Sequence, residues 1–434
     1  MNSKMNILVI GSGGREHAII KTLKRSPCLN KIYALPGNGG IEQDAICVDM
    51  SQSDFPNIGK FCRENQVDLV VVGPEQPLVE GITNFLENQG IKVFGPSKAA
   101  AALEGSKDFM KEVVTKYGVP TAAYQTFTDA NRAKNYVRDK GVPIVIKTDG
   151  LAAGKGVTVA LTQEEAVKAI DEAFAGKFGS AGKKIVIEEF LEGEEASFFV
   201  ISDGRHVMEF GSAQDHKRVF DGDEGPNTGG MGTYSPASVV TDFVRMKVME
   251  KIIAPTINGL ARDGIPYKGF LFAGLMIDKN GNPKLIEYNI RMGDPETQSI
   301  LTRLDTDLVE ILFKAACGKL NDIKEVRFSP STALCVVMAA KGYPEEYKKG
   351  FEIDLSATTA LTHSLQPTAV IYHAGTEKAD NKLISKGGRV LGVTGIGADI
   401  KAAYDNAYAC VERVKSDGLF CRKDIGFREL NRRK

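Results

Sequence analysis

Three short apolar runs, each followed by a turn that contains glycine, constrain the fold of this chain more than any other feature. The runs occupy residues 7–10, 69–72 and 93–94, and the sequences GSGG, GPE and GP follow them. Apolar runs without alternation are typical of strands that are buried on both faces of a parallel sheet. Because a helical pattern begins soon after the first run, we predict a parallel α/β sheet whose ligands gather at the carboxyl ends of its strands.

The fold class that we predict is α/β and α+β multidomain, since 434 residues suffice for about three domains. We expect an N-terminal parallel α/β domain at residues 1–102 and a second domain at 103–327. A small α+β domain is expected at 328–434, with strands at 332–340, 349–352, 369–374 and 389–394. The glycine-rich residues 221–232 are expected to form a long functional loop.

Charge and cysteine usage exclude several classes of protein. The chain has 55 basic and 55 acidic residues and a formal net charge of zero, which argues against a nucleic-acid binder that works by bulk electrostatics. The seven cysteines are scattered and never spaced as CxxC, which indicates reduced thiols in a cytoplasmic protein. No apolar run approaches the ~20 residues of a membrane span, so we expect no membrane association.

A strand near residue 288 carries the most informative polar side chains. Residues 285–291 read LIEYNIR, and their alternation predicts a half-buried strand on which Glu287, Asn289 and Arg291 share one face. A carboxylate beside an amide oxygen suits Mg²⁺, which takes oxygen ligands and bridges to phosphates. A solvated strand face with a counter-charged arginine is the simpler interpretation of this motif when it stands alone. The turn that follows places Asp294 at the rim of the strand.

Two segments upstream suit other parts of a nucleoside triphosphate. Residues 142–160 read as a strand, a glycine loop and a returning strand, with Lys147 at the end of the first strand. This is not a Walker A loop, because Gly156 rather than Ser or Thr follows Lys155 and a strand comes next. We expect a flap over phosphates; a flexible hairpin without function is the alternative. Residues 185–195 are expected to form an edge strand whose backbone reads adenine and whose final carboxylate holds ribose.

The first glycine loop, residues 11–14, is expected to hold a phosphate or sugar phosphate at the start of a helix. Glu16 stands where the motif GxGxxG needs its third glycine, which argues against NAD. A tight strand-to-helix turn without a ligand explains the loop equally well. Asn38 and Glu75 follow later strands and are either contacts to sugar hydroxyls or turn residues.

Four longer motifs give the chain a specific resemblance. They are KTDGLAAGKG at 147–156, QDHKR at 214–218, GPNTGGMG at 225–232 and RMGDPETQ at 291–298. On these motifs the chain resembles, over nearly its whole length, the glycinamide ribonucleotide synthetase (phosphoribosylamine–glycine ligase) family of the ATP-grasp superfamily. Thr148, Tyr288 and Met292 depart from the residues expected in this family, and none of them removes a charged group. Many ATP-grasp enzymes also have a metal carboxylate on the preceding strand, where residues 272–276 offer none.

The resemblance implies a substrate-binding, pre-ATP-grasp N-terminal domain at residues 1–102 and a two-lobed ATP-grasp fold at 103–327, with a mobile lid lobe at about 121–190. It also implies a small C-terminal domain at 328–434. It implies an enzyme of purine biosynthesis that ligates glycine to 5-phosphoribosylamine. ATP would be converted to ADP and phosphate through a glycyl phosphate intermediate. The implied cofactors are ATP and Mg²⁺, or Mn²⁺ in its place, and the implied partners are the two small-molecule substrates. We expect a cytoplasmic monomer that binds neither nucleic acid nor membrane.

The same resemblance implies roles for individual residues. Glu287 and Asn289 are expected to hold the metal ion, and the residues expected to take part in catalysis are Arg291, Lys147 and Asp215. The residues expected to bind ATP are Lys107, Lys147, Gly154, Lys155, Gly156, Glu188, Phe190, Leu191 and Glu195. The residues expected to bind the substrates are Gly11, Gly13, Gly14, Asn38, Glu75, Asp215, Arg291, Asp294 and Pro295. His17 and His216 either assist proton transfer or are satisfied structural histidines.

Three alternatives remain open on the sequence. They are another ATP-grasp carboxylate–amine ligase or carboxylase, a non-catalytic nucleotide sensor, and a Rossmann dehydrogenase. The dense polar clusters at residues 214–218 and 291–298 favour catalysis over sensing. Glu16 counts against the dehydrogenase.

Overall fold

The structure is a computed structural model that describes residues 4–150 and 156–432. Its N-terminal part is a five-stranded parallel sheet with the strand order β3-β2-β1-β4-β5. Side chains of β1 alternate between two hydrophobic clusters, with Leu8 and Ile10 in one and Ile7 and Val9 in the other. Burial on both faces confirms the strands predicted from the apolar runs. The elements are β1 (Met5–Gly11), α1 (Gly14–Leu23), β2 (Leu29–Pro36), β3 (Ile46–Cys47), α2 (Phe55–Glu64), β4 (Leu69–Val72), α3 (Glu75–Glu80), α4 (Ile82–Glu87), β5 (Val93–Phe94) and α5 (Lys98–Gly105).

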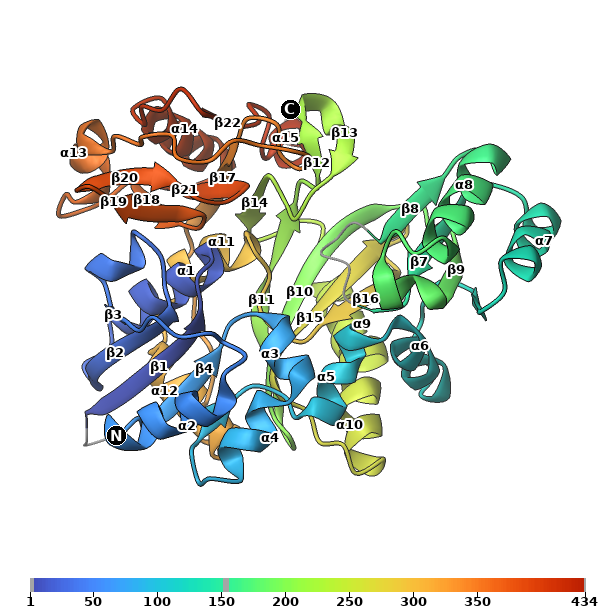
Figure 1. Ribbon diagram of the computed structural model, residues 1–434, viewed down its shortest axis with the longest axis horizontal. Helices are drawn as coiled ribbons and strands as arrows, with labels where there is room; N and C mark the ends of the chain where they lie inside the picture. Colours follow the sequence, from blue (N-terminus) through green and yellow to red (C-terminus); the bar gives the residue numbers. More distant parts are fainter. Residues whose placement is uncertain (1–3, 151–155, 433–434) are drawn as a thin grey trace.

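A four-stranded antiparallel sheet, ordered β6-β9-β7-β8, forms a lobe that projects to one side of the molecule (Figure 1). The buried members of its hydrophobic cluster all lie between Phe127 and Ile187, so this lobe packs around a core of its own. Helix α6 (Lys107–Lys116) precedes the lobe. Its elements are β6 (Tyr124–Phe127), α7 (Ala130–Lys140), β7 (Ile144–Thr148), β8 (Val157–Ala160), α8 (Gln163–Phe174) and β9 (Ile185–Glu189).

A nine-stranded sheet passes through the centre of the molecule in the order β16-β15-β10-β11-β14-β17-β21-β18, with β22 beside β17. Strand β14 joins its two halves, because it pairs with β11 on one side and with β17 on the other. The elements before the C-terminal part are β10 (Glu194–Asp203), β11 (Val207–Asp215), β12 (Arg218–Phe220), β13 (Glu224–Asn227), β14 (Gly232–Ser235), α9 (Asp242–Val248), a π-helical turn (Met249–Ile253), α10 (Ala254–Arg262), β15 (Lys268–Ile277), β16 (Pro283–Asn289), α11 (Glu296–Thr302) and α12 (Leu308–Ala316).

The C-terminal strands extend this central sheet. The other strands and helices of the C-terminal part surround these strands and cover one end of the N-terminal sheet, as Figure 1 shows. The elements are β17 (Thr332–Ala340), α13 (Thr359–Thr362), β18 (Ala369–His373), β19 (Thr376–Ala379), β20 (Lys382–Ser385), β21 (Arg389–Gly397), α14 (Ile400–Val411), β22 (Leu419–Phe420) and α15 (Phe427–Arg432).

Two sequence expectations about elements were wrong. The strand expected at 349–352 does not form: Glu352 makes only an isolated bridge to Ile384, and β19 and β20 form a hairpin nearby instead. The loop expected at 221–232 contains β13, which pairs with β12. Gly350 has a φ of 85°, which an extended strand does not contain, whereas in β13 glycine and proline hide the alternation on which strand prediction depends. Among the described residues, no helix is long and apolar enough to cross a bilayer.

Candidate functional site

Strand β16 carries Glu287 and Asn289 along the edge of the central sheet. Glu287 lies opposite Gly274 of β15, and a Cβ added at Gly274 would come within 3.4 Å of Glu287 Cγ. Gly274 and Glu287 line the same pocket, so no side chain from residue 274 occupies it. This glycine stands on the preceding strand, where no carboxylate was found in the sequence.

Positive side chains surround the Glu287 carboxylate. Burial alone would raise the pKa of Glu287, but nearby cations lower it, and these belong to Lys217, Lys147, Lys107 and Arg291. Lys147 Nζ donates a hydrogen bond at 3.3 Å to the carbonyl of Ile286, the residue before Glu287. Lys107 Nζ donates at 3.3 Å to the carbonyl of Gly150, at the start of the glycine loop. The charges of both lysines thus act on Glu287, and their expected meeting at one triphosphate stays a prediction.

Glu188 points inward and binds two lysines. Its Oε2 lies 3.0 Å from Lys147 Nζ and 3.3 Å from Lys111 Nζ, and both lysines are buried. The other oxygen, Oε1, is buried and has no hydrogen-bond partner in the described part of the chain. Burial, together with the charge of Lys147, lowers the pKa of Lys111 to about 8 although the charge of Glu188 opposes the shift. Phe190 and Leu191, the other residues expected at adenine, lie half-buried just beyond the end of β9.

Lys217 connects the QDHKR segment to Glu195, the residue expected to bind ribose. Lys217 Nζ lies 2.8 Å from Glu195 Oε2. Lys217 lowers the pKa of Glu195, and Glu195 and Glu287 raise the pKa of Lys217. Both side chains line a pocket at the sheet edge, together with Ala196, Ser197, Asp215, Phe272, Gly274, Leu275, Ile286 and Glu287.

Asp215 and Glu296 form a pair of carboxyl groups that have no cationic partner within ion-pair distance among the described residues. Burial raises the pKa of Asp215 well above its usual value, and the neighbouring charge of Glu296 adds to the effect. Burial also raises the pKa of Glu296. Asp215 accepts a hydrogen bond from the N–H of His216 at 2.7 Å, and Glu296 accepts one from Ser197 Oγ at 3.0 Å. A cation between the two carboxyl groups would compensate both.

The N-terminal glycine loop encloses the Glu16 carboxylate. Glu16 Oε2 accepts from the Gly13 N–H at 2.6 Å, and Oε1 accepts from Arg15 Nε at 2.6 Å. A Cβ added at Gly11 or at Gly73 would lie within 2.5 Å or 2.1 Å of the Glu16 side chain. The glycines therefore make room for an internal carboxylate, which explains why a glutamate interrupts the dinucleotide motif. A phosphate at this loop stays a prediction.

Arg291 joins the N-terminal sheet to the central sheet. Its Nε donates to Glu75 at 3.0 Å and its Nη2 to Glu104 at 2.8 Å. Burial alone would raise the pKa of Glu75, but Arg291 and Arg15 lower it to about 2. Burial raises the pKa of Glu104 to about 7 although Arg291 opposes it. Strict alternation does not reach residue 291, because β16 ends at Asn289 and the backbone then turns. The guanidinium of Arg291 is bound by these two carboxylates. Arg291 consequently acts on Glu287 only through the electrostatic effect of its charge.

Asn38 uses the whole hydrogen-bonding capacity of its side-chain amide within the protein. Its Nδ2 donates to the carbonyls of Ser12 at 2.8 Å and His373 at 2.9 Å. Its Oδ1 accepts from the N–H groups of Gly40 and Ile41, both at 2.9 Å. In this arrangement Asn38 ties the N-terminal loop to the C-terminal strand β18. Its expected contact to a sugar hydroxyl stays a prediction.

His17 and His216 are satisfied by neighbours on both ring nitrogens. His17 contacts Asp44 through Nε2 at 3.0 Å, and its Nδ1 accepts a backbone N–H at 2.8 Å. His216 Nδ1 lies 3.0 Å from the carbonyl of Gly232, and its Nε2 accepts the N–H of Gly426 at 3.0 Å. Burial lowers the pKa of both residues, that of His216 to about 4. The structure favours the structural alternative for both histidines.

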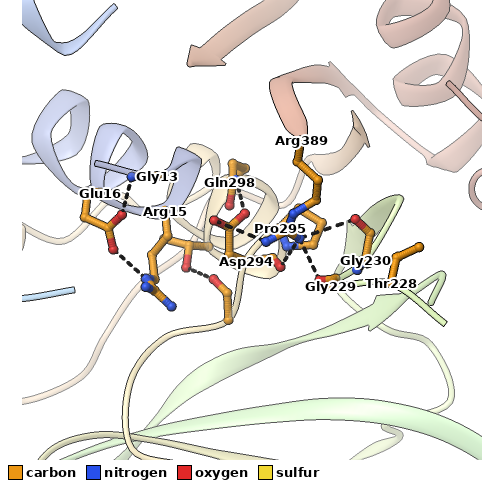
Figure 2. A network of polar contacts seen from close by, with 12 residues as sticks. Gly13, Arg15, Glu16, Thr228, Gly229, Gly230, Asp294, Pro295, Gln298 and Arg389 are labelled. Carbon is orange, nitrogen blue, oxygen red and sulfur yellow. Dashed lines mark hydrogen bonds and ion pairs between the residues drawn. The ribbon is translucent and has the colours of Figure 1, made fainter. Parts of the chain in front are cut away.

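Figure 2 shows Arg389 between the turn at residues 294–295 and the loop at residues 228–230. Its Nη1 donates to the carbonyls of Gly229 and Asp294, each at 2.6 Å, and to that of Gly230 at 3.3 Å. Its Nη2 lies 3.6 Å from the Asp294 carboxylate. Gln298, which lies next to Gly14 at the start of α1, donates to the same carboxylate at 2.9 Å. The turn is therefore held from both the N-terminal and the C-terminal side.

Sequence reasoning assigned no role to four residues at this site, Lys111, Lys217, Glu104 and Arg389. Lys217 could have been found, because it lies inside the QDHKR motif two residues after Asp215. The other three stand in ordinary helix or turn contexts and reach the site only through tertiary packing. Gly154 and Lys155, expected in the flap, lie outside the described residues, whereas the carbonyl of Gly156 accepts the N–H of Thr148 at 2.9 Å.

Three family models match consecutive parts of the chain. The N domain of phosphoribosylglycinamide synthetase matches residues 5–104, its ATP-grasp (A) domain residues 105–297, and its C domain residues 333–428.

Named relatives are similar to the chain over nearly its whole length. A protein of Rhizobium meliloti (strain 1021) named phosphoribosylamine–glycine ligase is 51% identical over 428 residues, which is 99% of each chain. The crystal structure of phosphoribosylamine–glycine ligase from Thermotoga maritima is 33% identical, covers 97% of this chain and 100% of its own, and has a TM-score of 0.83. The biotin carboxylase domain of 2-oxoglutarate carboxylase from Hydrogenobacter thermophilus, solved with MgADP and bicarbonate, shares the fold with a TM-score of 0.71 at 19% identity, covering 97% of this chain and 92% of its own.

Proposed function

The chain belongs to the phosphoribosylglycinamide synthetase family, and we propose that it ligates glycine to 5-phosphoribosylamine at the expense of ATP. The products are glycinamide ribonucleotide, ADP and phosphate, in a step of purine biosynthesis. One observation carries the proposal: the charges of Lys217, Lys147 and Lys107 act on Glu287, and the pocket that Glu287 lines also contains Asp215, which has no cation within ion-pair distance among the described residues. The lysine charges suit a triphosphate, and the carboxyl groups suit the ammonium of an amino acid.

The edge of β16 fits a magnesium ion that arrives with the nucleotide. Glu287 and Asn289 offer oxygen ligands, and Asn289 Nδ2 is buried without a hydrogen-bond partner, so this amide is not engaged by another group of the described chain. Among the described residues, no group of three or more His, Cys, Asp or Glu could hold a metal ion alone. Phosphate oxygens must then complete the coordination shell. Bound Mg²⁺, or Mn²⁺ in its place, would neutralise charge on the phosphates.

Transfer of the γ-phosphoryl group to the glycine carboxylate depends mainly on position and charge. We assign Lys107, Lys147 and Lys217 to the phosphate oxygens. Glu188 orients Lys147, and Arg291 adds a fixed positive charge near the developing acyl phosphate. Adenine is assigned to the segment after β9, with Glu188, Phe190 and Leu191, and ribose to Glu195. Gly154, Lys155 and Gly156 belong to the proposed flap.

The two substrates are assigned to neighbouring surfaces. Asp215, Glu296 and the turn with Asp294 and Pro295 receive the ammonium of glycine. The carboxyl edge of the N-terminal sheet receives 5-phosphoribosylamine, and the residues proposed there are Gly11, Gly13, Gly14, Asn38 and Glu75. The amine of 5-phosphoribosylamine attacks the glycyl phosphate, forms the amide bond and expels phosphate. The nucleophile thus belongs to the substrate, and no serine or cysteine nucleophile is needed.

We also propose three domains with boundaries at about residues 102 and 327, and a lid lobe at about 121–190. The separate hydrophobic cluster of the lobe supports its independent movement. We propose a cytoplasmic monomer, and the seven scattered cysteines, never spaced as CxxC, agree with a reducing compartment.

An assay coupled to ADP release, with glycine and freshly generated 5-phosphoribosylamine, tests the proposed function. We expect ADP release that requires both substrates, with no stimulation by other carboxylates or by bicarbonate. Stimulation by bicarbonate alone would indicate a carboxylase. Binding of ATP without turnover under all conditions would indicate a nucleotide sensor.

A further inference from the structure

Arg389, the first residue of β21, contacts both backbone segments that flank the Asp215–Glu296 pair. We propose that Arg389 is a positioning residue for the glycine-ammonium subsite, and that it acts through the backbone carbonyls of Gly230 and Asp294. This inference deepens the proposed function and rests on it.

The contacts of Arg389 fix two segments against each other. A single nitrogen, Nη1, donates to the carbonyls of Gly229 and Asp294 at 2.6 Å and lies 3.3 Å from that of Gly230. Arginine keeps its charge at any pH of interest and presents its donors in a planar fork. The loop at 228–230 and the turn at 294–295 are about 65 residues apart in sequence, so the arginine sets a distance that no local structure determines.

The fixed segments form walls around Asp215. A Cβ added at Gly230 would lie 2.5 Å from Pro295 Cδ and 2.7 Å from Asp215 Oδ1, so these three residues are tightly packed. Glu296 follows Pro295 directly and begins α11. The carbonyl of Asp294 is therefore two residues from Glu296 in sequence, and Gly230 borders Asp215 in space. A shift of either segment changes the separation of Asp215 and Glu296.

Arg389 also compensates the charge of one carboxylate in this region, that of Asp294. Burial alone would raise the pKa of Asp294, but Arg389 and Arg15 lower it, so Asp294 is a compensated carboxylate. Figure 2 shows Asp294 between these two arginines. The uncompensated negative charge is thereby confined to Asp215 and Glu296. Without Arg389, the Asp294 carboxylate would lose this compensation and would add negative charge at the turn that receives the ammonium of glycine.

Arg303, at the other end of α11, offers a matched control. Arg303 is buried, and it donates to the carbonyls of Ser331 at 2.6 Å and Ser329 at 3.1 Å and to Ser235 Oγ at 2.9 Å. It holds backbone segments of the same central sheet, but none of its acceptors borders Asp215. Loss of either arginine removes comparable backbone contacts, so a purely structural role predicts comparable effects.

The test compares steady-state kinetics of R389M, R389K, R303M and R303K with those of the wild-type chain, together with thermal midpoints. We expect R389M to raise the KM for glycine at least ~10-fold, with kcat at saturating glycine and the KM for ATP changed less than about 3-fold. R389K keeps the charge but not the planar fork of donors, so its KM for glycine should lie between those of the wild type and R389M. If R389M does not fold, R389K provides the test. The R303 variants should lower the midpoint and leave the KM for glycine unchanged.

Two results would overturn the positioning role. One is an unchanged KM for glycine in R389M and R389K, and the other is an equal rise in the R303 variants. A wild-type chain that releases no ADP in response to glycine would instead overturn the proposed function itself. The two failures are thus distinguished by the wild-type control.

Discussion

At the scale of single residues, the site has two halves that differ in charge. Cationic side chains predominate in one half and carboxyl groups in the other. Lysines and an arginine outnumber the carboxylates at Glu287, whereas Asp215 and Glu296 have no cation within ion-pair distance among the described residues. The halves are neighbours because Asp215 and Lys217 are two residues apart at the end of β11. A triphosphate and an ammonium group can therefore be held side by side, as the transfer of a phosphoryl group to glycine requires.

Replacing Glu287 tests the proposed metal ligand. We expect Glu287→Ala to reduce turnover by more than ~10², because charge neutralisation on the phosphates is the main catalytic term in phosphoryl transfer. The thermal midpoint should stay near that of the wild type. ADP release that depends on glycine and 5-phosphoribosylamine is the measurement, and Glu325→Ala, on an exposed side chain, is the control. Near-normal turnover would remove Glu287 from the metal site.

Lys217→Met tests the lysine that sequence reasoning missed. We expect turnover to fall by about 10- to 100-fold because a cation facing the phosphates is lost. Stability should hardly change, because the side chains of Lys217 and Glu195 are 44% and 49% exposed and such ion pairs contribute little. Lys382→Met is the matched control, since Lys382 forms an exposed pair with Glu352 at 2.8 Å. Equal turnover in both variants would show that Lys217 is only a surface charge.

At the scale of elements, a neutral histidine joins strands to the C-terminal helix. His216 follows β11, contacts the first residue of β14 through Nδ1, and accepts the N–H of Gly426 next to α15 through Nε2. Protonation of Nε2 would remove this acceptor and place a buried charge between Arg422 and Arg428, which both lower the pKa of His216. The hydrogen bonds at this junction therefore require a neutral imidazole ring.

Acid should weaken this junction. The pKa of His216 is about 4 in the folded chain and 6.5 as the ordinary value, so below pH 6.5 the unfolded chain binds a proton that the folded chain does not. The free energy of unfolding should fall as pH drops from about 6.5 to about 4, by on the order of 3 kcal/mol from this residue. Urea unfolding at a series of pH values measures the slope.

His216→Gln should reduce this slope, and His363→Gln, at an exposed position, should not. An equal slope in the His216 variant and in the wild type would show that other groups cause the acid sensitivity.

At the scale of the whole molecule, the C-terminal part completes the central sheet and holds the catalytic segment in place. Buried Arg422 donates to Asp223 at 2.9 Å, to the carbonyl of Arg218 at 3.0 Å and to Asp424 at 2.8 Å. These bonds attach the hairpin of β12 and β13 to the end of the chain. The hairpin directly follows Asp215 and Lys217, so the C-terminal part determines where both residues lie.

Loss of Arg422 should therefore affect stability and activity together. We expect Arg422→Met to lower the free energy of unfolding by roughly 3–5 kcal/mol, because two carboxylates lose a buried partner. Turnover should fall as the hairpin detaches, and limited proteolysis should cut near residues 218–227. Arg413→Met, at an exposed position, is the control. A wild-type proteolysis pattern and turnover in Arg422→Met would contradict this role.

Local sequence patterns predicted most helices and strands, because such patterns depend only on residues that are neighbours in the sequence. The apolar runs of β1, β4 and β5 and the alternation of β16 are visible without any tertiary information, and so is Lys147 at the end of a strand. The alternation failed at Arg291, where the strand had already ended, and at β13 and β19, where polar and glycine residues hide the period. The position of Asn38 after its strand was visible, but its four internal hydrogen bonds were not.

The sequence by itself determined the family, the parallel N-terminal sheet and the residue types that suit ATP and a metal ion, because motifs and periodicity are local properties. Only the tertiary structure decided that Glu16 fills the first glycine loop, that Lys217 faces Glu195 and that Arg389 reaches Asp294 across 95 residues. The last of these contacts depends on how β14 joins the two halves of the central sheet. No local preference encodes that pairing, since it arises when distant segments bury their apolar faces together.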